Sequence, residues 1–167
     1  MRTDHQANEE LQIFKKFVSV YPDKINEETI KNIDSPYPDI FCETQSGQKL
    51  YFELTECVVE SIAKSTGDLI KESRSQNRGE VISGQVTAFT EDALFEKSMG
   101  KFKKTYEKMN ADDSIELVSY FNQQIEPLSD VLLQYKSFVE LNISSSPFKR
   151  VWVYSVYQNE VLSMYSF

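Results

Sequence analysis

Two acidic residues lie inside short apolar segments of this 167-residue chain, and their spacing allows them to share a cation. Asp39 lies in the segment 37–42 and Glu53 in the segment 50–56, and both segments have the composition of β-strands. Removing a carboxylate from water costs on the order of several kcal/mol unless it is paired, hydrogen-bonded or bound to metal. Two carboxylates that face each other also repel, so a divalent cation is their natural partner.

The residues between the two segments form a predicted hairpin turn, because 44–48 is polar and contains a glycine. Directly opposed residues of an antiparallel pair share a face of the sheet. Asp39 opposes Glu53 only if the loop has an odd number of residues, such as 45–47. A two-residue turn instead places Ile40 opposite Glu53 and separates the carboxylates, unless a bulge beside Asp39 restores the pairing.

This arrangement resembles the PD-(D/E)XK phosphodiesterase superfamily, whose fold is restriction-endonuclease-like. The resemblance rests on Pro38-Asp39 and on Glu53-Leu54-Thr55, with Thr55 at the family's usual lysine position. It is closest to the subset with a Glu-X-Thr strand. It implies a metal-dependent nuclease in which Asp39, Glu53 and the main-chain carbonyl of Leu54 bind Mg²⁺ or Mn²⁺. Thr55 could hydrogen-bond the attacking water, but it lacks the positive charge of lysine.

The resemblance also implies a replacement lysine, which in several branches of the family comes from a following helix. A helix is predicted for 91–109, where Phe95, Met99 and Phe102 begin an apolar stripe. Lys103 lies roughly 80° from the centre of that stripe, at its flank, so it is our candidate for the catalytic lysine. The other lysines of this helix are expected to point outward, where they form either a solvated face or a basic rail along nucleic acid.

Glu10 is the remaining candidate ligand, because an acid of the first helix reaches the metal in the family that this chain resembles. A helix is predicted for 7–20, and Glu10 lies within its apolar arc, between Phe14 and Phe17. The alternative is a glutamate favoured by the helix dipole, with its carboxylate in water. Both interpretations stay open at this point.

Composition limits the remaining possibilities. The only histidine is His5, in a polar leader, so a histidine-based zinc site and a Ser-His-Asp triad are close to excluded. Cys42 and Cys57 are predicted to be free thiols, and no apolar run approaches the roughly 18 residues of a membrane span. With a polar start to the chain, these features favour a cytoplasmic protein that does not associate with membranes.

The net charge of −8 argues against strong nonspecific binding to nucleic acid, although a local basic surface remains compatible with it. Nucleic acid of unknown type is the partner that the resemblance implies. The alternative function is a catalytically inactive member of the same fold, which acts as an acidic interaction or inhibitor module. Stabilisation by Mg²⁺ separates the two, because only the nuclease needs the cation.

The order of predicted elements indicates an α/β (α+β) fold with a central mixed β-sheet flanked by helices. We expect one domain over 1–167, with an insertion or flap at about 58–94. The last strand is apolar, and at an edge of the sheet it would be a candidate homodimer interface. The predicted elements are a helix at 7–20, a short helix at 26–32, the hairpin 37–56, a helix at 91–109, a strand at 114–121, a helix at 127–142, and strands at 151–157 and 161–167.

Overall fold

The computed structural model describes residues 3–58, 87–88, 91–110, 112–126 and 129–166. Its helices are α1 (Asp4–Val18), α3 (Glu91–Phe102), α4 (Ser129–Asn142) and the short 3₁₀ turn η1 (Ile143–Ser145). Its strands are β1 (Ile25–Asn32), β2 (Ile40–Thr44), β3 (Lys49–Glu56), β4 (Thr87–Ala88), β5 (Ser114–Phe121), β6 (Ile125–Glu126), β7 (Arg150–Ser155) and β8 (Glu160–Ser166).

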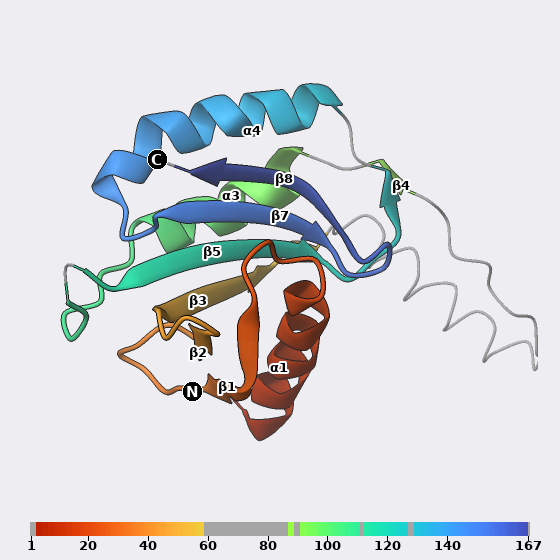
Figure 1. The fold of residues 1–167 in the computed structure, drawn as a ribbon. Coiled ribbons are helices and arrows are strands. Elements are labelled where there is room, and N and C mark those ends of the chain that lie inside the picture. The colour runs from red at the N-terminus through yellow and green to blue at the C-terminus, as the bar shows by residue number, and fades with distance from the viewer. Residues whose placement is uncertain (1–2, 59–86, 89–90, 111, 127–128, 167) are drawn as a thin grey trace, which may run out of the picture.

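The main sheet is mixed and has six strands in the order β1-β2-β3-β5-β7-β8 (Figure 1). The strands β3, β5 and β7 are parallel, while β1, β2 and β8 run antiparallel to their neighbours. Parallel neighbours need a crossover, and α3 and α4 lie between β3 and β5 and between β5 and β7 along the chain. The prediction of a mixed sheet flanked by helices is therefore confirmed.

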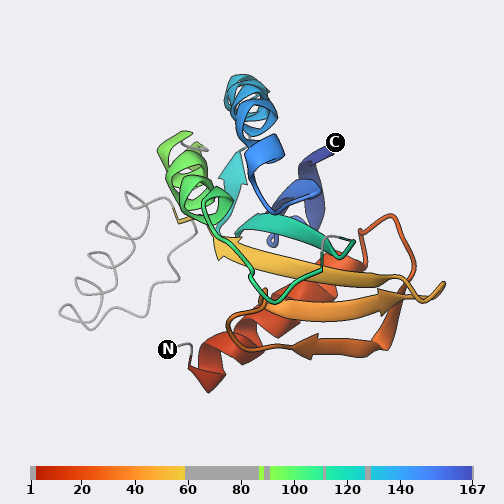
Figure 2. The same cartoon turned by 90° about the vertical axis from the view of Figure 1, so that its left-hand side faces the viewer.

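The helices divide the molecule into three layers, with α1 on one face of the sheet and α3 and α4 on the other (Figure 2). On the α1 face, Phe17 packs edge-on against Trp152 and Tyr154, with ring centroids 5.5 and 5.3 Å apart. On the opposite face Phe102 of α3 packs against Phe138 of α4. Strand alternation decides which side chain of the sheet enters which of these two cores.

The helix α1 begins three residues earlier than predicted because Thr3 caps it. The Thr3 side chain accepts from the Gln6 backbone N–H, and the Gln6 side chain accepts from the Thr3 N–H in return. This capping box satisfies two of the N–H groups that a helix start leaves without partners. The buried stripe consists of Ile13, Phe14 and Phe17.

The hairpin between β2 and β3 has the three-residue loop 45–47. Thr44 donates its N–H to the Gln48 carbonyl at 2.9 Å, which closes the loop. Gly47 has φ +85°, a left-handed conformation that side chains disfavour. The loop therefore has an odd number of residues, which is the condition for placing Asp39 opposite Glu53.

We expect Gly47→Ala to lower the free energy of unfolding by about 1 kcal/mol, because alanine is strained at this φ. Gly100 is the matched control, since it lies in α3 with open space around the position of a Cβ. Gly100→Ala should instead stabilise the protein by about 0.5–1 kcal/mol. Urea denaturation of both variants checks the two signs, and equal signs would contradict this account of the hairpin.

Two predicted helices differ from the structure. The segment predicted as a helix at 26–32 is the edge strand β1, whose pairing with β2 overrides its local preference. The helix predicted for 91–109 ends at Phe102, where the chain turns and Lys104 donates its N–H to the Lys101 carbonyl. The residues after this turn therefore do not follow the helical spacing used in the prediction.

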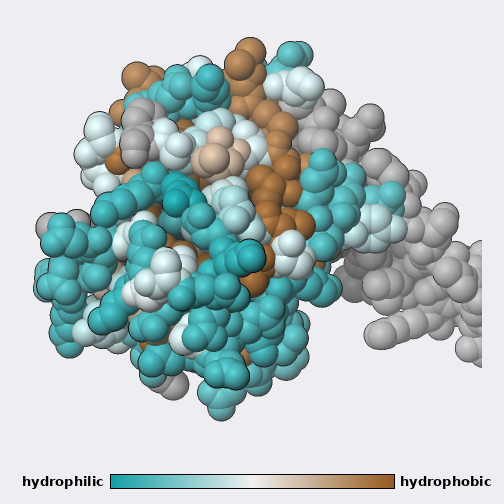
Figure 3. Space-filling view, in the orientation of Figure 1, coloured by the Kyte–Doolittle hydropathy of each residue, from teal (hydrophilic) through white to brown (hydrophobic). Residues whose placement is uncertain are grey.

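Most of the expected insertion at 58–94 lies outside the described residues. Within it, β4 pairs with β6 in a separate two-stranded parallel sheet. The C-terminal strand β8 is an edge of the main sheet, as expected, and Met164 on it is 44% exposed. Hydrophobic side chains reach the surface over α4 and β8, while the surface over α1 is hydrophilic (Figure 3). Among the described residues, no helix is long and apolar enough to cross a membrane.

Candidate functional site

Asp39 immediately precedes β2, and the register of the hairpin places it opposite Glu53. Ile40 pairs with Phe52, so the next position outward joins Asp39 to Glu53. The Leu54 backbone N–H donates to Asp39 Oδ2 at 2.9 Å, which fixes the Asp39 carboxylate beside β3. Asp39 and Glu53 thus belong to one end of one hairpin, on one face of the sheet.

Pro38 explains why the main-chain carbonyl of Leu54 has no hydrogen-bond donor on the neighbouring strand. In an antiparallel pair, a hydrogen-bonded residue directs both its N–H and its C=O toward the same neighbour. Extending the register places Leu54 opposite Pro38, which has no N–H to donate to the Leu54 carbonyl. Since the Leu54 N–H points toward Asp39, its carbonyl lies on that same side of the strand. The proline therefore ends the ladder where an acid and a carbonyl come together.

Glu53 is completely buried, and three donors hold its carboxylate. Lys101 Nζ and Lys104 Nζ each lie 2.5 Å from Oε1, and the Tyr106 hydroxyl donates to Oε2 at 2.6 Å. Burial alone would raise the pKa of Glu53, but the charge of Lys101 and the hydrogen bonds from these three residues lower it below its ordinary value. The carboxylate is therefore ionised at neutral pH, inside a low-dielectric core.

The structure brings lysines other than the predicted Lys103 to Glu53. Lys101 and Lys104, which were expected to point outward, contact Glu53, whereas Lys103 between them is exposed. Two causes explain the error. The buried side of α3 contains Leu94, Ser98 and Phe102, a stripe rotated from the predicted one, and the helix ends before Lys103.

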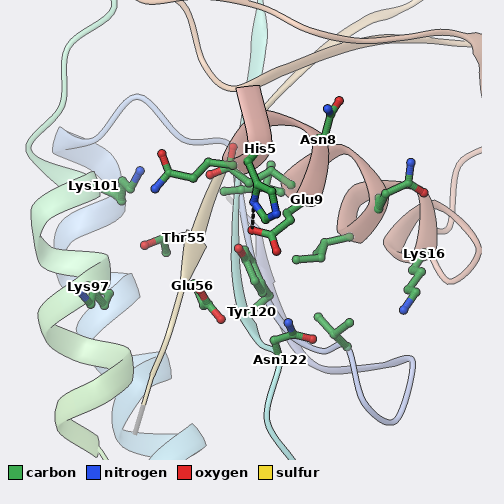
Figure 4. Close-up of a pocket in the computed structure, with 16 residues that line it drawn as sticks. His5, Asn8, Glu9, Lys16, Thr55, Glu56, Lys97, Lys101, Tyr120 and Asn122 are labelled. Carbon is green, nitrogen blue, oxygen red and sulfur yellow. Dashed lines mark ion pairs between the residues drawn. The ribbon is translucent and has the colours of Figure 1, made fainter. Parts of the chain in front are cut away.

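A pocket of about 760 Å³ adjoins this cluster at the carboxyl ends of β3 and β5, between α1 and α3 (Figure 4). Lys101 links the two regions, since it both contacts Glu53 and lines the pocket. The predicted site residues Glu10, Leu54 and Thr55 also line it. Ligands of open α/β sheets bind outside the carboxyl ends of the strands, so the pocket lies where the fold favours binding.

The predicted site residues Thr55 and Glu10, and the neighbouring acid Glu56, take distinct positions around this pocket. Thr55 is buried on the same face as Glu53 and points toward α3, where it can hydrogen-bond but carries no charge (Figure 4). Glu56 alternates to the other face and is exposed. Glu10 is half-buried in α1. It lines the same pocket as Leu54.

The oxygen atoms of Asp39, Glu53 and the Leu54 carbonyl partly meet the requirements of a hard divalent cation. A carboxylate, a second carboxylate and a main-chain carbonyl are oxygen ligands of the type that Mg²⁺ prefers. An ionised carboxylate has about four lone-pair positions, and three donors contact Glu53. Asp39 and the Leu54 carbonyl complete an oxygen-rich edge beside it. Among the described residues, no three His, Cys, Asp or Glu side chains are grouped closely enough to hold a metal by themselves.

Sequence reasoning missed a second buried acid, Glu116, in the middle of β5. It accepts from the Tyr21 hydroxyl at 2.9 Å and from Trp152 Nε1 at 2.7 Å, on the α1 face. Burial raises the pKa of Glu116, although Trp152, Arg150 and Tyr21 oppose the shift. The signal was available, because an acid within an apolar strand is the same pattern that singled out Glu53.

Neither family models nor curated proteins nor solved structures give a match to this chain.

Proposed function

We propose that the protein is a divalent-metal-dependent nuclease that hydrolyses phosphodiester bonds of DNA or RNA. The observation that carries the proposal is the hairpin end, where Asp39 is set against Glu53 and Pro38 leaves the Leu54 carbonyl beside them. This combination of two acids and a carbonyl is what the resemblance to the PD-(D/E)XK superfamily implies. The mixed sheet with helices on both faces supports the same resemblance.

Asp39, Glu53 and the Leu54 carbonyl would hold Mg²⁺ or Mn²⁺, with Glu10 near enough to the pocket to contribute. When bound, such an ion supplies Lewis acidity toward a phosphoryl oxygen and lowers the pKa of water. Lys101 takes the role that the sequence assigned to Lys103. Its ammonium group, between Glu53 and the pocket, stabilises negative charge that develops on a phosphate.

Lys104 and Tyr106 position the carboxylate instead. Both donate to Glu53, which fixes its orientation and keeps it ionised. Lys104 Nζ also lies 5.8 Å from the centroid of the Tyr106 ring, a cation–π distance that ties the two side chains together. Thr55 can orient a water molecule with its hydroxyl, and the charge that it lacks comes from α3.

The buried thiols of Cys42 and Cys57 are free, which supports our proposal that the protein acts in a reducing compartment such as the cytoplasm. The exposed edge β8 supports the further proposal of a homodimer through the C-terminal strands. Neither point is needed for the chemistry of Glu53.

The alternative is a metal-free interaction module of the same fold. Its support is the ion-pair cluster itself, because two lysines already neutralise the buried acid that the cation would otherwise neutralise. Under this alternative the net charge of −8 serves contact with a basic partner. Divalent metal then has no effect on the protein.

Metal binding and cleavage test the proposal together. We expect Mn²⁺ or Mg²⁺ at ten times its Kd to stabilise the protein by about 1.4 kcal/mol and to permit cleavage of labelled DNA or RNA, both reversed by EDTA. Asp39→Asn should lose the stabilisation, because the neutral amide keeps the hydrogen bond from Leu54 but not the charge. Thermal melting and a gel assay on single- and double-stranded substrates measure the two effects.

Asp34→Asn is the matched control, since Asp34 is an exposed acid of the same loop. It should respond to metal like the wild type. A wild-type protein with neither metal stabilisation nor cleavage would favour the interaction module. A metal response that survives Asp39→Asn would place the cation elsewhere.

A further inference from the structure

Tyr120 is a buried phenol in the centre of the pocket between α1 and α3. Its side chain belongs to β5, is 4% exposed and lines the pocket. A phenol hydroxyl that lines a pocket can donate a hydrogen bond to a ligand and can also accept one. Burial, followed by the charges of Glu56 and Glu10, raises the pKa of Tyr120, which keeps the phenol protonated and able to donate.

Charged groups of both signs line the pocket around Tyr120. The acids are Glu9 and Glu10 of α1 and Glu56 of β3, and His5 lies 3.3 Å from Glu9. Lys16 lies on the α1 side, while Lys97 and Lys101 lie on the α3 wall (Figure 4). Carboxylates only accept hydrogen bonds when they are ionised, and ammonium groups only donate. The carboxylates therefore suit a group with several N–H donors, and the lysines of the α3 wall suit an anion.

A nucleotide combines these two requirements, and guanine meets the first one best. The Watson–Crick edge of guanine presents two neighbouring N–H donors, which one carboxylate can accept together, and an O6 acceptor for a phenol. Adenine, cytosine and uracil do not place two donors side by side on that edge. The phosphate of the same nucleotide would then lie toward Lys97 and Lys101, next to Glu53.

We propose that this pocket binds one unpaired guanine of a nucleic acid strand, with the attached phosphate against the α3 lysines. The inference deepens the proposed nuclease function and rests on it for the identity of the strand. It makes the substrate single-stranded or locally unpaired, because pairing occupies the base edge that the pocket reads. It also gives the carboxylates of the pocket a role that phosphate binding alone does not.

Calorimetric titration with the four mononucleotides GMP, AMP, CMP and UMP, in EDTA, tests the pocket separately from catalysis. We expect GMP to bind about tenfold more tightly than the others. Tyr120→Phe keeps the ring but removes the donor, so it should weaken GMP binding by about twofold to tenfold. Glu56→Gln should reduce the preference for GMP, and Lys97→Met should weaken all four mononucleotides alike. Lys103→Met, an exposed lysine outside the pocket, is the control and should change nothing.

The outcomes separate this inference from the proposed function. Metal-dependent cleavage without mononucleotide binding, or GMP binding that Tyr120→Phe does not weaken, overturns the guanine site and leaves the nuclease standing. Selective GMP binding without cleavage supports the site and contradicts the nuclease. Equal affinity for all four mononucleotides overturns the choice of base.

Discussion

Replacing Glu53 by glutamine is expected to lower the free energy of unfolding by about 2–3 kcal/mol at neutral pH, without metal. The variant leaves the ammonium groups of Lys101 and Lys104 near a buried position with no compensating charge. Removing one partner of a fully buried pair costs about 3–5 kcal/mol. The smaller figure applies here because Lys104 is 46% exposed and can turn into solvent. Urea denaturation in EDTA measures the difference.

The difference in free energy of unfolding between the wild type and Glu53→Gln is expected to depend on pH. The folded state lowers the pKa of Glu53 from its ordinary value of 4.5, so the group stabilises the fold above that value. The stabilisation is lost as pH falls through the folded pKa. The gap between wild type and Glu53→Gln should therefore be largest near pH 7 and shrink below about pH 4.5.

Glu56→Gln is the control for this experiment, because Glu56 lies three residues along the same strand but faces the other side and is exposed. Burial and the charge of Glu9 raise the pKa of Glu56, so removing its charge should cost nothing or stabilise slightly. Glu116 also has a raised pKa, but it is present in every protein compared and cancels in the difference. An equal or more stable Glu53→Gln would mean that the lysines do not hold the carboxylate.

The second large effect concerns Lys101, near the end of α3, in comparison with Lys103 and Lys104, which follow the helix. If the protein is the nuclease that we propose, Lys101→Met should reduce kcat by about 10²–10³, the range for removing one preorganised charge from a transition state. Lys101 is the lysine that touches both Glu53 and the pocket. Methionine keeps the length of the side chain, so packing against α3 changes little.

Lys104→Met and Lys103→Met complete the comparison. Lys104 contacts Glu53, so its loss should weaken metal-dependent activity by about tenfold through the carboxylate, with a corresponding loss of stability. Lys103 is exposed, and its replacement should leave both quantities unchanged. Single-turnover kinetics with saturating Mn²⁺ separates the chemical step from binding. A larger loss in Lys103→Met than in Lys101→Met would restore the assignment made from helical spacing.

The sequence alone determined the features that depend on short-range pattern. Alternating apolar residues located β3 and β5, and an acid within each of the segments 37–42 and 50–56 indicated the site. The turn composition restricted the hairpin to a few registers, of which the odd loop is the one that the protein adopts. These results follow because strand periodicity and glycine turns are set by a few neighbouring residues.

Only the tertiary structure decided which distant residues meet these acids. The polar segment 26–32 becomes a strand because β2 offers it an edge, which no local propensity encodes. Lys101 reaches Glu53 from the last turn of α3, whereas Lys104 and Tyr106 reach it because the helix ends at Phe102 and the chain turns there. Helical spacing predicts directions only while the helix continues, so it selected Lys103. The depth at which Glu53 and Tyr120 are buried likewise depends on packing between elements that are far apart in the chain.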